Sequence, residues 1–87
     1  MINKSEIKND LLELLENVFN IEVNNIDENQ NLFEFIEMDS LSLIEMLVCI
    51  ENKFDIELYD EELDFNSFST LNQIIEVIIR HKTEQLL

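Results

Sequence analysis

The chain has 87 residues with 46% hydrophobic content, no glycine, no proline and a single cysteine. A chain of this length has material for one hydrophobic core, so we expect a single domain over residues 1–87. The lack of glycine and proline disfavours tight hairpins and favours a helical bundle. The lone Cys49 excludes an internal disulfide.

The charge of the chain is strongly acidic. Twenty Asp and Glu against five Lys and Arg give a formal net charge of −15, and residues 10–52 contain no basic residue. Such a surface repels nucleic-acid backbones and favours encounters with proteins that carry basic patches. The longest apolar run, residues 46–50, is too short to span a bilayer, and no leader pattern precedes the first helix. We therefore expect a soluble, cytoplasmic protein.

The first element expected along the chain is an amphipathic helix over residues 5–19, whose apolar side chains recur every three to four residues. The next segment, residues 20–38, is polar but carries scattered apolar residues. A loop of this length is unusual in a compact domain. We expect it to pack down on the bundle, with a short helical turn near residues 32–35.

Two further helices are expected in the second half of the chain. One runs from about Ser40 to Lys53, and a short turn follows near residues 60–63. The last helix begins at Thr70, where Thr70 and Gln73 have the spacing of a capping box. Its apolar stripe comprises Leu71, Ile74, Ile75 and Ile78.

The start of the second helix is a candidate binding site. Asp39 is a favoured N-cap residue, and Ser40 falls in the first turn behind it. Unpaired N–H groups and the helix dipole favour an anion there by roughly 0.3–1 kcal/mol. On its own, the tripeptide Asp39-Ser40-Leu41 favours an ordinary Asp cap followed by an idle surface serine, so the case for a binding site depends on its surroundings.

The second helix carries two apolar stripes, which lie on roughly opposite sides at about 100° per residue. One side holds Leu43, Met46, Leu47, Ile50 and Phe54. The other holds Leu41, Ile44 and Val48, flanked by Glu45 and Glu51. Only one stripe can face the core, so we expect the second to form a docking surface for proteins. The alternative is that the long loop covers it.

The order of these elements and the tripeptide Asp39-Ser40-Leu41 resemble the acyl carrier protein family over nearly the whole chain. Leu32-Phe33 is similar to the pair ahead of the family's serine, and residues 54–57 to the segment that closes its second helix. Thr70-Leu71 is similar to the start of its last helix. The resemblance implies an all-α, small four-helix bundle with three longer helices, one short helix and a long loop between the first and second.

The resemblance also implies a function. Ser40 would carry 4′-phosphopantetheine donated by coenzyme A, and the chain would hold an acyl or aminoacyl thioester without catalysing a reaction itself. Expected partners are a phosphopantetheinyl transferase, a loading enzyme and a downstream synthase or transferase. The family's recognition positions map onto Asp39, Leu41, Ile44, Glu45 and Val48. We add Glu51, a carboxylate that flanks the second apolar stripe, to this expected partner surface.

The sequence departs from the family pattern at two places. Glu37 stands where the family usually has glycine, and Tyr59 replaces a common proline. Residues 64–71 are more similar to free-standing aminoacyl or peptidyl carriers, including D-alanyl carriers. The cargo and pathway stay open among fatty acid, polyketide and amino acid.

Other chemistry is less well supported by the sequence. A serine nucleophile needs a neighbouring base, but the only histidine, His81, lies in the last helix, where we expect it to be solvated. Cys49 is expected to be a small core residue, and residues 60–62 a solvated acidic face that binds divalent cations weakly at most. We expect no metal site and no catalytic residue.

Two other functions fit the acidic composition. The first is an unmodified acidic helical adaptor for a basic protein partner. The second is an acidic inhibitor that mimics nucleic acid, which would leave the placement of Asp39-Ser40-Leu41 unexplained. We expect a monomer, although the second apolar stripe leaves the pairing of two copies open.

Overall fold

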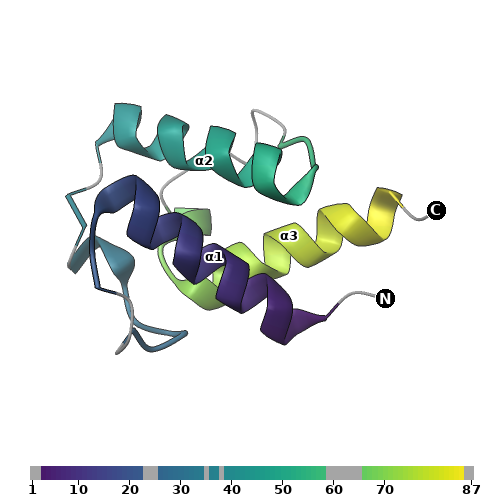
Figure 1. Ribbon diagram of the computed structural model, residues 1–87, viewed down its shortest axis with the longest axis horizontal. Helices are drawn as coiled ribbons and strands as arrows, with labels where there is room; N and C mark the ends of the chain where they lie inside the picture. The colour runs from purple at the N-terminus through teal and green to yellow at the C-terminus, as the bar shows by residue number, and fades with distance from the viewer. Residues whose placement is uncertain (1–2, 23–25, 35, 38, 59–65, 86–87) are drawn as a thin grey trace.

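The computed structural model describes residues 3–22, 26–34, 36–37, 39–58 and 66–85. These residues contain helices and turns but no strand (Figure 1). The elements in chain order are α1 (Lys4–Phe19), the 3₁₀ turn η1 (Leu32–Glu34), α2 (Ser40–Phe54), the 3₁₀ turn η3 (Asn66–Phe68) and α3 (Leu71–Gln85). The part of the chain that the structure describes is therefore all-helical.

The three longer helices confirm the prediction, and each begins within a residue or two of its expected start. The short turn expected near residues 32–35 is present as η1. The short turn expected near residues 60–63 lies outside the described residues, so the fourth helix stays a prediction. The structure adds η3, which the sequence reading did not anticipate.

The capping residues explain where α3 begins. The backbone N–H of Gln73 donates to the Thr70 hydroxyl at 3.2 Å, and the Gln73 side-chain oxygen accepts from the Thr70 N–H at 3.2 Å. Each residue thus satisfies a donor that the helix itself leaves unpaired. The predicted capping box is confirmed.

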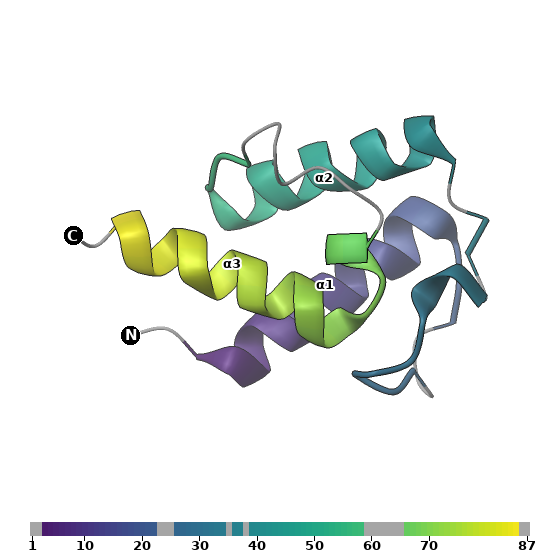
Figure 2. The ribbon, with the colours of Figure 1, turned by 180° about the vertical axis from the view of Figure 1, so that it is seen from behind.

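Helix α1 packs against both α2 and α3, while η3 packs against α3 (Figures 1 and 2). One apolar stripe of each long helix faces the shared core. Burying each large side chain contributes roughly 1.5–3 kcal/mol before chain entropy is counted. The fully buried large residues are Leu11, Leu15, Leu32, Met46, Ile50, Phe68, Leu71, Ile74, Ile75 and Ile78.

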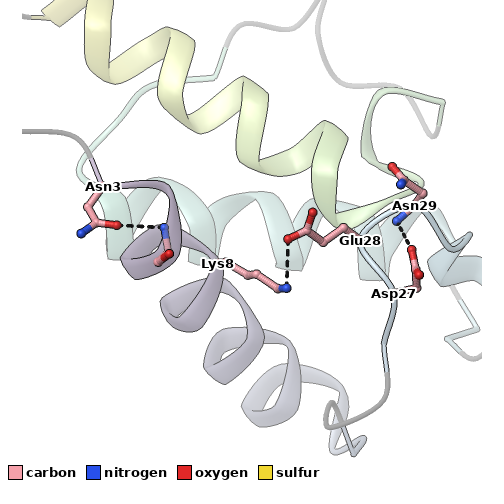
Figure 3. Close-up of polar contacts among 6 residues, drawn as sticks. Asn3, Lys8, Asp27, Glu28 and Asn29 are labelled. Carbon is pink, nitrogen blue, oxygen red and sulfur yellow. Dashed lines mark hydrogen bonds and ion pairs between the residues drawn. The ribbon is translucent and has the colours of Figure 1, made fainter.

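The segment that leads into α2 is fastened to two helices. The Leu32 N–H donates to the Ser69 carbonyl at 2.7 Å, just before α3, and the Asn72 N–H donates to the Glu28 carbonyl at 2.9 Å. The Glu28 carboxylate also forms an ion pair of 2.9 Å with Lys8 on α1 (Figure 3). Leu32 is fully buried, so the predicted packing of this loop onto the bundle is confirmed.

Asn20 and Asp55 end α1 and α2 in the left-handed conformation, each with a φ of 54°. In a chain without glycine, Asn and Asp are the residues that accept this conformation at least cost. After α2 the Ile56 N–H donates back to the Glu51 carbonyl at 3.2 Å. Ile56 itself is buried, so this end of α2 is both hydrogen-bonded and packed.

The prediction that His81 is solvated is wrong. Its exposed fraction is only 4%, and its Nδ1 lies 3.9 Å from a carboxylate oxygen of Glu84 one turn away. His81 follows Ile78 by three residues and Ile74 by seven, which places it on the buried stripe of α3. Its position on the helix, rather than its residue type, decided its burial.

Candidate functional site

The site is built from the first residues of α2. Asp39 has extended backbone angles (φ −94°, ψ −179°), and its Oδ1 accepts the backbone N–H of Ser42 at 2.7 Å. Its carbonyl oxygen accepts the Leu43 N–H at 3.0 Å, which is the first bond of the helix. The predicted N-cap is confirmed, and Ser40 is the exposed first residue of the 15-residue helix α2.

Hydrogen bonds donated by Ser42 also stabilise the charged form of the Asp39 carboxyl group. They lower the pKa of the Asp39 carboxyl below its ordinary value, with the backbone N–H of Ser42 as the larger cause and the Ser42 hydroxyl as the smaller one. A carboxylate that accepts such bonds is favoured in its charged form. Asp39 therefore stays negative at neutral pH directly beside Ser40.

The residues at this helix start fit a phosphopantetheine arm. An arm attached to serine adds a phosphodiester, which is a negative group, and the N-terminus of an α-helix favours negative charge. Ser40 is exposed, so its hydroxyl can be reached by a modifying enzyme. When bound, the arm supplies a thiol that can hold a carboxylic acid as a thioester.

The second apolar stripe of α2 is exposed to solvent. The exposed fractions of Leu41, Ile44 and Val48 are 74%, 54% and 49%, and we call these three residues the α2 strip. Of the two carboxylates beside it, Glu45 is exposed and Glu51 is half-buried. The alternative that the long loop covers the strip is therefore wrong. The α2 strip lies on the same helix as Ser40 and begins at the next residue.

Cys49 is not a full core residue. It is half-buried, packs against the edge of the core, and lines a hollow at the surface between α1 and α2. The residues lining this hollow are Leu14, Asn17, Val18, Cys49, Asn52 and Lys53. The hollow was not predicted from the sequence, because two helices contribute to it. The apolar pattern of one helix does not determine where the other helix lies.

The described residues contain no group of three or more His, Cys, Asp or Glu side chains placed to hold a metal ion. The acidic cluster at residues 60–62 lies outside them. Within the same described ranges, no helix is long and apolar enough to cross a membrane.

The family model described as the phosphopantetheine attachment site matches residues 9–78, which is most of the chain. The chain belongs to this family of carrier proteins. The match includes α2 and its start, so it covers the site described above.

Two proteins with similar sequences are named as carrier proteins. The carrier is 31% identical over 71 residues to the D-alanyl carrier protein of Streptococcus sanguinis strain SK36, spanning 82% of this chain and 89% of that protein. It is 28% identical over 74 residues to the acyl carrier protein of Buchnera aphidicola subsp. Schizaphis graminum, spanning 85% and 91%.

A solved structure shows the same fold. It is described as the solution structure of a non-covalent extended docking domain complex of the Pax NRPS, PaxA T1-CDD/PaxB NDD. The TM-score is 0.71 at 24% identity, over 91% of this chain and 71% of that one. At this identity the similarity establishes the fold alone.

The family assignment and the named relatives establish the general function. The protein is a carrier that holds an acyl or aminoacyl group on a covalently attached 4′-phosphopantetheine arm for biosynthesis. The resemblance read from the sequence is confirmed, and so is the cofactor it implied.

Proposed function

We propose that Ser40 is the attachment residue and that the cargo is an aminoacyl group. The observation that carries the attachment is the exposed Ser40 at the capped start of α2, inside the segment that the family model matches. The helix N-terminus favours the charge of the phosphodiester. Asp39 holds this helix start in place through its bond to Ser42.

The protein presents the cargo and has no catalytic turnover of its own. Ser40 anchors the arm, and the α2 strip with Glu45 and Glu51 contacts the transferase, the loading enzyme and the downstream acceptor. An apolar strip beside carboxylates suits brief contacts that are steered by charge. Each enzyme can then bind, act and leave within one cycle of the carrier.

The aminoacyl cargo is supported by relatives named D-alanyl carrier proteins. The sequence of residues 64–71 also resembles free-standing aminoacyl or peptidyl carriers. The test is to purify the protein from its native host, release the thioester with hydroxylamine and identify the product by mass spectrometry. An amino acid hydroxamate is the expected product. A fatty-acyl or polyketide product would contradict this part of the proposal and leave the attachment at Ser40 intact.

The attachment is tested by intact-protein mass spectrometry. Incubation of the protein with coenzyme A, magnesium and a broad-specificity phosphopantetheinyl transferase should add the mass of one arm. Ser40→Ala should abolish the gain, and Ser42→Ala is the matched control on the same turn, which should keep it. A gain that persists in Ser40→Ala would place the arm elsewhere. No gain with several transferases would favour the unmodified adaptor.

The carrier is proposed to act as a single domain and as a monomer in the cytoplasm. The net charge of −15 opposes association of two copies. Analytical ultracentrifugation at near-physiological salt should give the mass of one chain. A dimer that Ile44→Ser dissolves would show instead that the α2 strip pairs two copies.

A further inference from the structure

The five basic residues of this chain are confined to one end of each long helix. Lys4 and Lys8 lie in the first two turns of α1, and Lys53 lies in the last turn of α2. Arg80 and Lys82 lie in the last two turns of α3. The rest of each helix carries no Lys or Arg. None of these cations belongs to the attachment site or to the α2 strip.

These three helix ends meet at one end of the molecule. A second hollow, of about 270 Å³, is lined by the start of α1, the end of α2 and the end of α3, with Ile7, Phe54 and Lys82 among its residues. Both views show the two chain termini and the end of α2 on one side, and the start of α2 on the other (Figures 1 and 2). We call residues 3–10, 51–57 and 79–85 the terminal end.

Negative charge is concentrated away from the terminal end. Residues 11–50, which include Ser40 and the α2 strip, carry nine carboxylates and no Lys or Arg, and we call them the acidic half. The terminal end carries five cations and six carboxylates, so it is close to neutral. A helix of 15 residues is about 22 Å long, and α2 spans this distance from Ser40 to the terminal end. The molecule therefore has a charge dipole whose negative end contains Ser40.

A charge dipole has an effect that net charge alone does not have. The net charge of −15 attracts a basic protein whichever side of the carrier faces it. An uneven distribution of the same charge also rotates the carrier, because a basic patch attracts the acidic half and repels the cations of the terminal end. We therefore expect the Ser40 side to turn toward such a patch before the two proteins touch.

We propose that this separation of charge orients the carrier as it approaches a modifying or loading enzyme with a basic patch, so that Ser40 arrives first. The cations of the terminal end are then positioning residues, because they neutralise that end. Lys53, for example, lies 13 residues from Ser40, about 20 Å along α2. The inference rests on the proposed function, since it takes the Ser40 side of α2 as the docking side. It adds that the location of charge, at constant net charge, sets the rate of encounter.

The test uses three double variants that keep the net charge of −15 and change only exposed residues of α1. Lys4→Glu with Glu16→Lys moves positive charge by 12 residues into the acidic half, about 18 Å along the helix. Lys4→Glu with Glu6→Lys is the matched control, because it exchanges the same charges within the terminal end. Glu6→Gln with Asn17→Asp moves one negative charge into the acidic half and enlarges the dipole. None of these residues lies on α2.

The measurement is the rate of arm attachment with the carrier kept well below its KM, in low and in high sodium chloride. In about 0.01 M salt, where the Debye length is about 30 Å, the Lys4–Glu16 exchange should slow attachment at least threefold. The Lys4–Glu6 control should keep the wild-type rate, and Glu6→Gln with Asn17→Asp should exceed it. In about 1 M salt, where the Debye length is about 3 Å, all four rates should agree. Circular dichroism checks that each variant is folded, and damage to the fold would not speed attachment.

A second measurement separates this inference from the attachment at Ser40. The same variants are made in a Ser40→Ala background, and their association rates with the transferase are followed by stopped-flow fluorescence. The order of rates should be the same, since orientation does not need the serine hydroxyl. Equal rates for the two lysine exchanges at low salt, a difference that persists in about 1 M salt, or no measurable association would overturn the inference. An arm that still attaches in Ser40→Ala would contradict the proposed attachment residue, and the order of association rates would still decide the role of the dipole.

Discussion

Asp39 shows how a single carboxylate can start a helix and make stability depend on pH. Its pKa is lowered in the folded protein by hydrogen bonds from the backbone N–H and the hydroxyl of Ser42. A lowered folded pKa contributes stability that is fully present above the unfolded pKa of about 3.9. That contribution is lost as the pH falls through the folded pKa. The hydrogen bond and the opposite charge of Lys8 likewise lower the pKa of the Glu28 carboxyl, so its contribution to stability depends on pH in the same direction.

Asp39→Asn tests this contribution, because asparagine keeps a capping oxygen but does not titrate. The melting temperature of the wild type relative to Asp39→Asn should rise as the pH is raised from below the folded pKa to neutrality. Asp39→Ala, which lacks the oxygen, should melt lowest at neutral pH. Thermal unfolding followed by circular dichroism over a pH series measures all three. If the difference in melting temperature between wild type and Asp39→Asn does not change with pH, the cap bond does not lower the pKa of the Asp39 carboxyl.

At the scale of the element, α2 divides its apolar residues between stability and recognition. Leu47 is buried and Ile44, three residues earlier, has an exposed fraction of 54%. Leu47→Ala should lower the free energy of unfolding by about 2–5 kcal/mol, since it leaves a cavity in the core. Ile44→Ala should change it by no more than about 0.5 kcal/mol. Urea denaturation distinguishes them, and equal losses would mean that the α2 strip is covered in solution.

The carboxylates beside the α2 strip give a functional prediction. Charge reversal of Glu45 and Glu51 to lysine should slow arm attachment and loading, because it removes the attraction to basic patches on both enzymes. The fold should persist, since Glu45 is exposed and Glu51 is half-buried. The matched control reverses Glu16 and Glu76, which are exposed on α1 and α3. Equal slowing in both double variants would assign the effect to net charge rather than to α2.

For the molecule as a whole, the net charge of −15 lowers the stability of the fold but speeds binding to basic partner enzymes. Added sodium chloride shortens the Debye length from about 10 Å at 0.1 M to about 3 Å at 1 M, which screens repulsion among the carboxylates. The melting temperature should therefore rise with salt, while the rate of arm attachment falls. Glu16→Gln with Glu57→Gln and Glu76→Gln should reduce the rise. A melting temperature that is independent of salt would contradict the repulsion.

The features that depend on neighbours along the chain could be predicted from the sequence. The period of the apolar residues set α1, α2 and α3, and short-range pairs set the caps at Asp39 and Thr70, because both follow from the geometry of one helix. The same period separated the buried stripe of α2 from its exposed strip. The same spacing also places His81 on the buried stripe of α3. The prediction of a solvated His81 was wrong because it followed from the polarity of histidine and not from its position on the helix.

The features that join distant segments could not be predicted from the sequence and are visible only in the folded protein. The ties from Glu28 to Lys8 and Asn72, and from Leu32 to Ser69, connect residues whose separation in sequence gives no signal of contact. The hollow between α1 and α2 arises in the same way, from side chains of two helices at one packed seam. Local geometry repeats along a helix and can be read from its sequence. The relative placement of helices depends on how all their buried side chains pack together, and no single segment of the chain contains that information.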